Sequence, residues 1–522
     1  MSSATKPTTE ESSPTSTQVY CVHGADPEVQ AYAMAKYSRS AMSMKETLAE
    51  LNEQKAEKFL NTFYFQYGHR SIADLAHIAM AVERLSLLAA TIVVDEQRWD
   101  GQERSTRYQD FKKSGYYTPN FGDEESARIF RETIEFLFSE YREFSELMFR
   151  HLASQTPRPS DMDEDAYRRT LKARAFDISR YLLPLATNTS LGQIVNARTL
   201  ETQVSRLLSD PRAEVRQLGE TMKQAARGAS HNVNHDAYRA LADAIRAKDE
   251  SLAELAEAQL LRPVRVSPTL VKYADANNYE IETRGALRQA VRELMNGEPI
   301  AETPEVDLLD DDPLEIELAT TLLYEHSHYP YRQLREAVRS MGEARRQEII
   351  DLGLRFRGKH DELLRAFSAG QRFRFDILMD IGGYRDMHRH RRCTQIIQDY
   401  TFANGFDTPP DVTAAGLGER YGQAMMRAAG AGQTLASKLA GRGEEAESFQ
   451  YLIPLAYRKR ALFKMDFAEV VYISELRTTP AGHWSYRNVA WKMYETTAHR
   501  YPALARYFRV TDVRVPVDLL KR

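Results

Sequence analysis

The hexapeptide YLLPLA, which begins at Tyr181, returns almost unchanged as YLIPLA at Tyr451. Each copy is followed by a helical segment and then by an arginine-bearing stretch, SRLLSDPRAEVR at Ser205 and LRTTPAGHWSYR at Leu476. Because the period is a whole domain and not a few dozen residues, the chain is not a solenoid. We infer an ancient tandem duplication, and 522 residues leave each copy long enough for a core of its own.

Apolar periodicity predicts a chain that is mostly helix with a little strand. Asp26 as N-cap and Pro27 at the first helical position open one helix. The segment from Ile72 has helical spacing up to about Glu83, and Ser86 could cap a second element there. Further helices are expected at about 124–155, 163–182, 192–208 and 212–247, and a short strand at 19–22.

The stretch between residues 262 and 313 differs from both halves, because it is rich in proline, glycine and acidic residues. It predicts a connector that contains one helix at 283–295. We therefore expect a disordered tail at 1–17, a first domain at 18–261, a connector at 262–313 and a second domain at 314–522.

Composition excludes several classes of protein. A hydrophobic content of 43% and a charged content of 28% are typical of soluble globular proteins, and no apolar run is long enough to cross a bilayer. The Ser/Thr/Pro-rich start lacks the apolar core of a signal peptide, so we expect a cytoplasmic protein. Cys21 and Cys393 are too few for a disulfide framework. A net charge of -4 argues against broad nucleic-acid binding.

The segment HRHRRCTQ, from His388 to Gln395, is the densest basic cluster of the chain. Guanidinium groups offer a planar fork of donors, so Arg389, His390 and Arg391 suit phosphate or carboxylate oxygens. Nearby aspartates allow a surface salt-bridge network as the alternative. A zinc site would lack a fourth ligand at a standard spacing, and a nucleic-acid patch would need a wider basic area, so we expect neither.

The first half carries a second polar string, QERSTRY, with Gln102 at its start. In an extended chain Glu103, Ser105 and Arg107 would face one way and suit a nucleotide monophosphate. The alternative is an ordinary solvated loop. Three further candidates have similar alternatives: Arg198 on a predicted helix is either a ligand or an exposed side chain, and His69 and Ser71 either bind phosphates or cap a turn and a helix.

Taken together, these segments resemble the signature of the flavin-dependent thymidylate synthases. The order and spacing carry the resemblance, in GHRSIAD from Gly68, QERSTRY, LLPLATNT from Leu182, NARTL from Asn196 and AEVR from Ala213. Where that family has Arg-His-Arg, the first half has Asp95, Glu96 and Gln97. The second half has the Arg-His-Arg but replaces the later glutamate, serine and arginine by Ile397, Asp399 and Thr401. Each repeat thus keeps what the other has lost.

The resemblance implies an α+β, helix-rich fold of two tandem domains, each with a small, mostly antiparallel sheet and packed helices. It also implies reductive methylation of dUMP to dTMP, with FAD as cofactor and NADPH and methylenetetrahydrofolate as co-substrates. Family members are homotetramers whose sites draw on several subunits, so this chain would pair as a homodimer and form a pseudo-tetramer. The alternative is a catalytically lapsed paralogue that binds FAD or a nucleotide, or acts as an interaction partner.

The same resemblance assigns roles to the candidate residues at one site shared by the two repeats. Arg389 and His390 would polarise the pyrimidine. FAD would be held by His69, Ser71, Arg389, His390 and Arg391, and dUMP by Gln102, Glu103, Ser105, Arg107 and Arg198.

Overall fold

The computed structural model describes residues 22, 24–36, 44–49, 70–112, 114–272, 274–358, 361–518 and 520. They divide into two compact units, one from Met1–Ala76 and Gly228–Leu270 and the other from His77–Arg227 and Val271–Arg522, and each unit is considered by itself. The tail at 1–17, most of the strand expected at 19–22, Cys21 and His69 lie outside the described residues.

The first unit contains α1 (Pro27–Lys36), α2 (Met44–Ala49), η2 (Arg70–Leu75), α9 (His235–Arg246) and α10 (Glu250–Leu260). Helix α1 begins at Pro27 as predicted. The carboxylate of Asp26 accepts hydrogen bonds from Nη1 and Nη2 of Arg262 at 2.9 and 2.7 Å. Buried Glu28 accepts the backbone N–H groups of Thr269 and Leu270 at 2.9 and 2.7 Å. These contacts fasten the start of α1 to the segment that follows α10.

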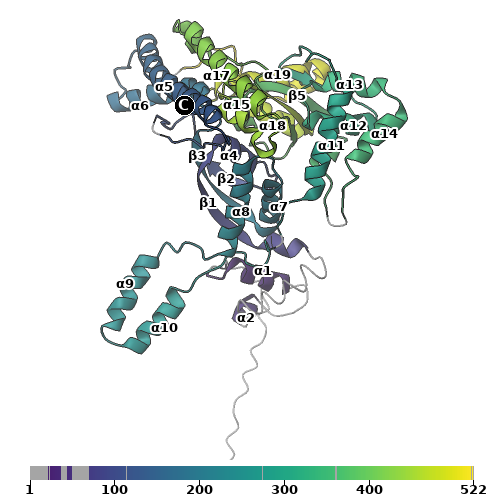
Figure 1. The fold of residues 1–522 in the computed structure, drawn as a ribbon. Helices are drawn as coiled ribbons and strands as arrows, with labels where there is room; N and C mark the ends of the chain where they lie inside the picture. Colours follow the sequence, from purple (N-terminus) through teal and green to yellow (C-terminus); the bar gives the residue numbers. More distant parts are fainter. Residues whose placement is uncertain are drawn as a thin grey trace, which may run out of the picture. The chain divides into compact units, whose positions relative to one another are not determined.

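The second unit holds two small antiparallel sheets (Figure 1). The first has the order β1-β3-β2, from β1 (His77–Ser86), β2 (Asp100–Glu103) and β3 (Asn188–Asn196). The second has the order β4-β5-β7-β6, from β4 (Val306–Leu308), β5 (Phe373–Asp380), β6 (Thr394–Ile397) and β7 (Arg458–Met465). Strands β1, β3 and β2 therefore match β5, β7 and β6 in order and direction, and the predicted α+β, helix-rich class is confirmed.

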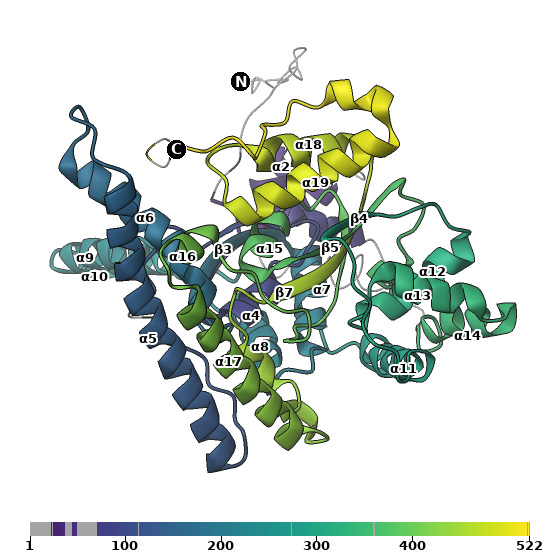
Figure 2. The same cartoon turned by 90° about the horizontal axis from the view of Figure 1, so that it is seen from above.

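Helices surround both sheets of this unit. The first repeat has α4 (Leu87–Val93), α5 (Glu124–Gln155), α6 (Glu164–Ser179), η3 (Arg180–Leu182), α7 (Ala197–Leu208) and α8 (Ala213–Arg227), and α11 (Asn278–Leu294) follows it. The second has α12 (Leu314–Glu325), α13 (Tyr331–Ser340), α14 (Glu343–Leu352), η4 (Arg365–Phe367), α15 (Ile381–Met387), α16 (Pro410–Ala414), α17 (Gly418–Leu439), η5 (Gly443–Glu445), η6 (Ser448–Leu452), α18 (Phe467–Thr478), α19 (Trp484–Arg500) and η7 (Pro502–Tyr507). The long helices α5 and α17 pack side by side (Figure 2).

Three of the helix predictions are wrong in part. The apolar segment from Ile72 forms η2 and then strand β1, and the helix expected from residue 192 begins only at Ala197, after β3. Residues such as Ile78, Val82 and Leu85 fit either period over so short a stretch, and pairing of β1 with β3 decides for strand. The predicted helix at 212–247 is interrupted between α8 and α9. Ser86 caps α4 as predicted, since its Oγ accepts from the Ala89 N–H at 2.9 Å.

The repeated hexapeptide joins the two repeats. Its copies run antiparallel with a bridge between Pro184 and Pro454. The backbone N–H groups of Leu185 and Ala186 donate to the second copy at 2.9 Å, and those of Leu455 and Ala456 donate back to the first at 3.0 and 3.2 Å. The reciprocal bonds give the second unit a local twofold axis at this motif. The motif that reveals the duplication in sequence is therefore also a direct contact between the duplicates.

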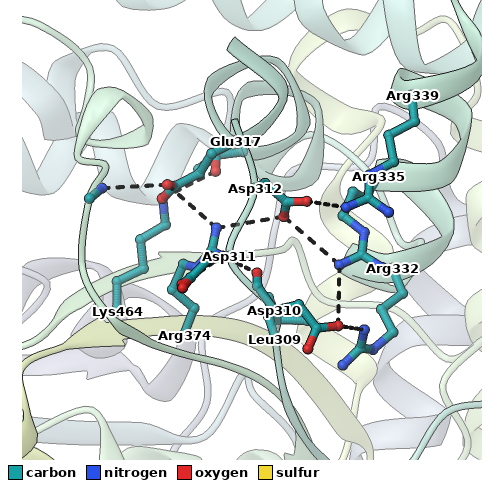
Figure 3. A network of polar contacts seen from close by, with 12 residues as sticks. Leu309, Asp310, Asp311, Asp312, Glu317, Arg332, Arg335, Arg339, Arg374 and Lys464 are labelled. Carbon is teal, nitrogen blue, oxygen red and sulfur yellow. Dashed lines mark hydrogen bonds and ion pairs between the residues drawn. The ribbon is translucent and has the colours of Figure 1, made fainter. Parts of the chain in front are cut away.

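The acidic run after β4 lies in a dense network of charges (Figure 3). The Asp312 carboxylate lies 2.6 Å from Nη2 of Arg339 and 3.7 Å from Nη1 of buried Arg374. Arg374 also lies 3.4 Å from Glu317, whose other oxygen accepts from Lys464 at 2.9 Å. Asp312, within the stretch expected to be a connector, thus links α13 to the second sheet, and Glu317 links α12 to it. Among the described residues, no helix combines the length and apolar character needed to span a membrane.

Candidate functional site

The HRHRR segment forms the turn between α15 and β6. Both of its histidines are buried, and burial lowers the pKa of each. His388 stacks on Tyr384, with ring centres 5.2 Å apart, and its Nε2 lies 3.1 Å from Asp95 of the first repeat.

Within the described part of the chain, no group of three or more His, Cys, Asp or Glu side chains is arranged to hold a metal ion.

His390 faces the second repeat. Its Nε2 accepts a hydrogen bond from Nε of Arg477 at 2.7 Å, and its Nδ1 lies 3.5 Å from Glu469. Both ring nitrogens therefore have partners on α18. This placement makes His390 an anchor of the turn rather than a group that faces the first repeat.

The arginines of the turn are arranged differently from its histidines. Arg389 is exposed, and Arg392 forms an exposed ion pair with Asp466 at 2.8 Å. Arg391 is half-buried, with its guanidinium carbon 4.5 Å from the centre of the Trp99 ring of the first repeat. Burial and the neighbouring charge of Arg389 lower the pKa of Arg391, whose Nε has no hydrogen-bond partner among the described residues. In this turn the Arg389 side chain is thus exposed to solvent, whereas Arg391 packs against the first repeat.

Asp95 and Glu96 stand in the first repeat where Arg389 and His390 stand in the second. Asp95 accepts from Nη1 of Arg365 at 2.7 Å, and Glu96 accepts from Nη2 of Arg206 at 2.7 Å. Burial opposes ionisation of Asp95, but the charge of Arg365 and the His388 hydrogen bond hold its pKa well below the usual range. The pocket between this segment and the HRHRR turn has a volume of about 10 Å³, room for about one water molecule.

Glu103, Ser105 and Arg107 do not lie on one extended stretch, which was the condition for their facing one way. Strand β2 ends at Glu103, and the chain then turns, with the Arg107 N–H donating to Oγ of Ser105 at 3.2 Å. A hydroxyl two residues before an N–H favours such a turn over continued strand. Gln102 is exposed on the strand.

The turn carries Arg107 into the second repeat. Arg107 is buried, and its Nε donates to Asp177 at 3.0 Å. Its other two nitrogens donate to the Tyr486 hydroxyl at 3.0 Å and to the carbonyl of Ala481 at 3.2 Å. Glu103 forms an ion pair with Arg385 of α15. Both first-repeat residues therefore have partners from the other repeat.

Arg107, Arg180 and Arg385 form what we call the first arginine cluster. Arg180 and Arg385 both donate to Oγ1 of Thr106, at 3.3 and 3.2 Å. Arg180 is 2% exposed, yet its Nε and Nη2, like Nε of Arg385, have no hydrogen-bond partner within the described chain. Unmet buried donors are costly, so a cluster of them indicates a place for an acceptor such as a phosphate.

Asp177 organises the first arginine cluster. Its Oδ1 lies 3.0 Å from Nε of Arg107 and 3.3 Å from Nε of Arg180, and its Oδ2 lies 3.0 Å from Nδ1 of His483. Nε2 of His483 in turn lies 2.7 Å from the Tyr181 hydroxyl. Burial opposes ionisation of Asp177, but His483 and the two arginines lower its pKa far below the usual range. One ionised carboxylate therefore orients two guanidinium groups.

The equivalent place in the second repeat, which we call the second arginine cluster, is built from Arg212, Arg288, Asp210, Asp399 and Glu447. Arg288 of α11 donates to Asp399 at 2.6 Å and to Glu447 at 3.2 Å. Arg212 makes two bonds of 2.8 Å to Asp210 and one of 3.0 Å to Gln450. Each guanidinium here faces carboxylates. This cluster is neutralised from within the chain.

Two other predicted residues lie elsewhere. Arg198 is in the first turn of α7, with its Nη2 3.4 Å from Glu362. Ser71 is exposed in η2 of the first unit. Sequence reasoning missed Arg180, Arg385, Asp177 and His483. A signal for Arg180 was present, because it directly precedes the first hexapeptide, where the second copy has Gln450.

The fold and the site define a duplicated α+β protein whose repeats share a buried arginine cluster. The model of the family described as thymidylate synthase complementing protein matches residues 21–229 and 306–503. These two segments are most of the chain, one in each repeat. The chain belongs to this family, to which the flavin-dependent thymidylate synthases belong, and is a divergent member of it.

Relatives extend over different parts of the chain. A UPF0159 protein of Chlamydia pneumoniae is 28% identical over 524 residues, which cover 93% of this chain and 90% of the relative. A flavin-dependent thymidylate synthase of Clostridium tetani is 27% identical over 175 residues, 34% of this chain and 67% of the relative. A solved structure of the flavin-dependent thymidylate synthase of Helicobacter pylori with FAD and dUMP is 15% identical and covers 39% of this chain and 91% of that chain, with a TM-score of 0.24.

Proposed function

We propose that the chain binds a nucleotide monophosphate, dUMP in the first place, at the first arginine cluster and methylates it reductively to dTMP. The observation that carries the proposal is that buried N–H donors of Arg180 (Nε and Nη2) and of Arg385 (Nε) make no hydrogen bond with the described residues, although Asp177 and Glu103 form ion pairs with these arginines. A phosphate offers several acceptor oxygens and charge to match them. Family membership supplies the reaction class.

The cofactor would be FAD, held by Arg389 and Arg391. Both fit a phosphate, because the first is exposed and the second has an Nε without a partner in the described chain. When bound, FAD would supply the redox chemistry, with NADPH as reductant and methylenetetrahydrofolate as carbon donor. His390 would hold the turn in place through α18, so that Arg391 stays against the first repeat.

The small volume of the two pockets is our argument that a second copy of the chain is needed to complete each site. The pocket beside the HRHRR turn and the pocket beside Arg107 each have a volume of about 10 Å³, far below what a nucleotide fills. A homodimer that forms a pseudo-tetramer would add walls to each site, as family sites draw on several subunits. Arg198 stays a predicted nucleotide contact, and His69 and Ser71 stay predicted flavin contacts.

One observation favours the second candidate function, a catalytically lapsed protein that still binds FAD or a nucleotide. Glu103, proposed to bind substrate, is ion-paired with Arg385, and Asp95 is ion-paired with Arg365. A site closed by its own side chains has lost part of the space that the reaction needs.

The two candidates separate in one set of assays on the purified chain. We expect flavin absorption near one FAD per chain after reconstitution, NADPH oxidation that is faster with dUMP present, and rescue of a thymidine auxotroph. Binding without oxidation or rescue would establish the lapsed protein. A chain that takes up neither FAD nor dUMP would contradict both.

A matched pair of variants tests the arginine cluster itself. Arg385→Gln removes donors from the first cluster, and Arg288→Gln removes them from the second. Loss of charged hydrogen bonds of about 1.5–3 kcal/mol predicts that Arg385→Gln weakens dUMP binding by about 10- to 150-fold in calorimetric titration. Arg288→Gln should leave it within about twofold. Equal effects would mean that the two clusters do not differ in function.

A further inference from the structure

Helices α9 and α10 form a hairpin (Figure 1), and several of its apolar side chains are exposed. The hairpin lies between the two segments that match the family, so it is an addition to the shared fold. Its stem is closed by a bridge between Ala229 and Arg265, and by a hydrogen bond of 2.8 Å from the Ser230 N–H to the carbonyl of Val264. The addition is therefore a structured element.

The two helices are antiparallel and meet through alanine. Arg239 near the start of α9 pairs with Glu257 near the end of α10 at 2.8 Å, and Arg246 at the end of α9 pairs with Glu250 at the start of α10 at 3.2 Å. Ala242 and Ala253 are fully buried, and they are the buried residues of the two helices. Two alanines bury little apolar area, so this contact alone gives two short helices little stability.

The leucines of the hairpin lie outside this contact. Leu241, Leu252 and Leu255 are 49%, 52% and 58% exposed. Tyr238 and Ile245 are half-buried. Along the chain these five residues follow a spacing of three and four, which is the spacing of the core positions of a helical bundle. We call them the leucine stripe.

Helix geometry puts the stripe on one side of the hairpin. Leu241 directly precedes Ala242, and Leu252 directly precedes Ala253. Each leucine therefore leaves its helix about 100° from the alanine contact, in the same rotational sense. In two antiparallel helices that sense leads to the same side. Asp243 and Glu254 directly follow the same alanines and so lie on the opposite side.

We propose that the leucine stripe is a self-association surface, on which the hairpin of a second copy of this chain packs to form a four-helix bundle. Two hairpins with apolar core positions on one side are the halves of such a bundle. The stripe carries no charge, so it does not repel its own copy and offers no ion to a charged partner. The arginines of the hairpin are already paired with its own glutamates. A twofold contact between identical surfaces is the commonest way for a chain to pair.

The proposal rests on the hairpin and not on the proposed function. Leu241→Glu with Leu252→Glu puts two charges into the stripe at exposed positions, so folding should be preserved. The control is Ala240→Glu with Ser251→Glu, which adds the same charges at the exposed residues directly before those leucines, about 100° around each helix. All three full-length proteins would be compared by sedimentation over a range of concentrations.

We expect the stripe variant to dissociate at least about a hundredfold more readily than the wild type, because four leucines lose burial in each pair of chains. The control should associate like the wild type. Equal association of stripe variant and control would overturn the proposal. So would a wild-type chain that stays monomeric, or a stripe variant that melts at lower temperature with unchanged association, which would place the stripe against its own chain. FAD and dUMP titrations of the same proteins report on the proposed function separately.

Discussion

The two arginine clusters occupy equivalent places in repeats of the same fold, yet they differ in how their charges are met. In the first, three guanidinium groups share the carboxylates of Asp177 and Glu103, and N–H donors of Arg180 and Arg385 make no hydrogen bond within the described chain. In the second, Arg288 is supplied by α11 and meets Asp399 and Glu447. The difference teaches that duplication preserved the scaffold while the balance of donors and acceptors changed. The first cluster has three guanidinium groups for two carboxylates, whereas the second has two guanidinium groups for three carboxylates, so the first has the charge balance that suits an added anion.

The helix caps of the two repeats, in contrast, keep an equivalent hydrogen bond. In the first repeat Ser86 caps α4 and its hydroxyl donates to Glu214 at 2.6 Å. In the second repeat Asp380 caps α15 and accepts from Ser485. Carboxylate and hydroxyl have exchanged places between the cap and the following helix, but the hydrogen bond remains. Positions that hold the scaffold thus tolerate an exchange of partners, whereas the arginine clusters do not remain equivalent.

The largest expected effect comes from removal of the carboxylate that organises the first cluster. Asp177→Ala leaves Arg107 and Arg180 buried without their shared counter-ion, and we expect a loss of about 3–5 kcal/mol in the free energy of unfolding, measured by urea denaturation. The folded pKa of Asp177 is depressed. Its contribution is therefore complete above the unfolded value of about 3.9 and is lost as pH falls below it, so the variant should show a flatter acid dependence.

The control for Asp177→Ala is Asp399→Ala in the second cluster. Both should lower stability, because both carboxylates are buried next to arginines, but Asp177→Ala alone should also impair dUMP binding. Loss of nucleotide binding in a folded Asp399→Ala protein would break the distinction between the clusters.

A smaller effect is expected for the flavin contacts. Arg389→Ala or Arg391→Ala should weaken FAD binding by about 1.5–3 kcal/mol for each charged hydrogen bond lost, as measured by flavin fluorescence titration. Gln97→Ala is the matched control, because Gln97 holds in the first repeat the position that Arg391 holds in the second. It should change FAD binding very little. Similar losses at Gln97 and Arg391 would contradict the division of labour between the repeats.

The smallest expected effect on stability comes from Lys459, a buried amine whose pKa is influenced by Asp399 and Arg212 of the second cluster. Lys459 is buried, its Nζ lies 3.4 Å from the centre of the Tyr400 ring, and burial lowers its pKa to about 7. A folded pKa below the unfolded value of about 10.4 means that stability falls as pH drops from about 10 towards 7. Lys459→Met should remove this fall and be about 1–2 kcal/mol more stable than the wild type at pH 7.

Urea midpoints of Lys459→Met and wild type at pH 7 and pH 10 would check the sign, since the difference should shrink at the higher pH. The first repeat has Thr189 at the equivalent position, so Thr189→Val should change stability by an amount that does not depend on pH. A pH-independent difference for Lys459→Met would show that this amine does not titrate in that range.

Local signals gave much of the fold. The amphipathic pattern of 124–155 matches α5 from end to end, and Ser86 was recognised as a cap because a hydroxyl before an apolar run is a short-range signal. The same periodicity failed at β1, where Ile78, Val82 and Leu85 fit both a helix and a strand. Pairing with β3 makes this segment a strand, and that partner is more than a hundred residues further along the chain.

Short-range signals likewise predicted some residues of the candidate site and missed others. Arg107 and Arg391 were found from the order of motifs, but Arg385 was not, because its partner Glu103 is 282 residues away in sequence. Spacing along the chain carries no information about such a distance. Glu103, Ser105 and Arg107 do not share an extended face, because the chain turns directly after β2, where Oγ of Ser105 accepts the Arg107 N–H.

The sequence by itself determined the duplication, the family and most of the helices, because a repeated hexapeptide, a series of motifs and a period of 3.6 residues are all properties of neighbouring positions. Only the tertiary structure decided which charges neutralise each other. Electrostatic energy depends on separation in space and on burial, and both are set when the two copies of the hexapeptide pair. That pairing places Arg385 beside Glu103 and leaves Nε and Nη2 of Arg180 without a hydrogen bond among the described residues.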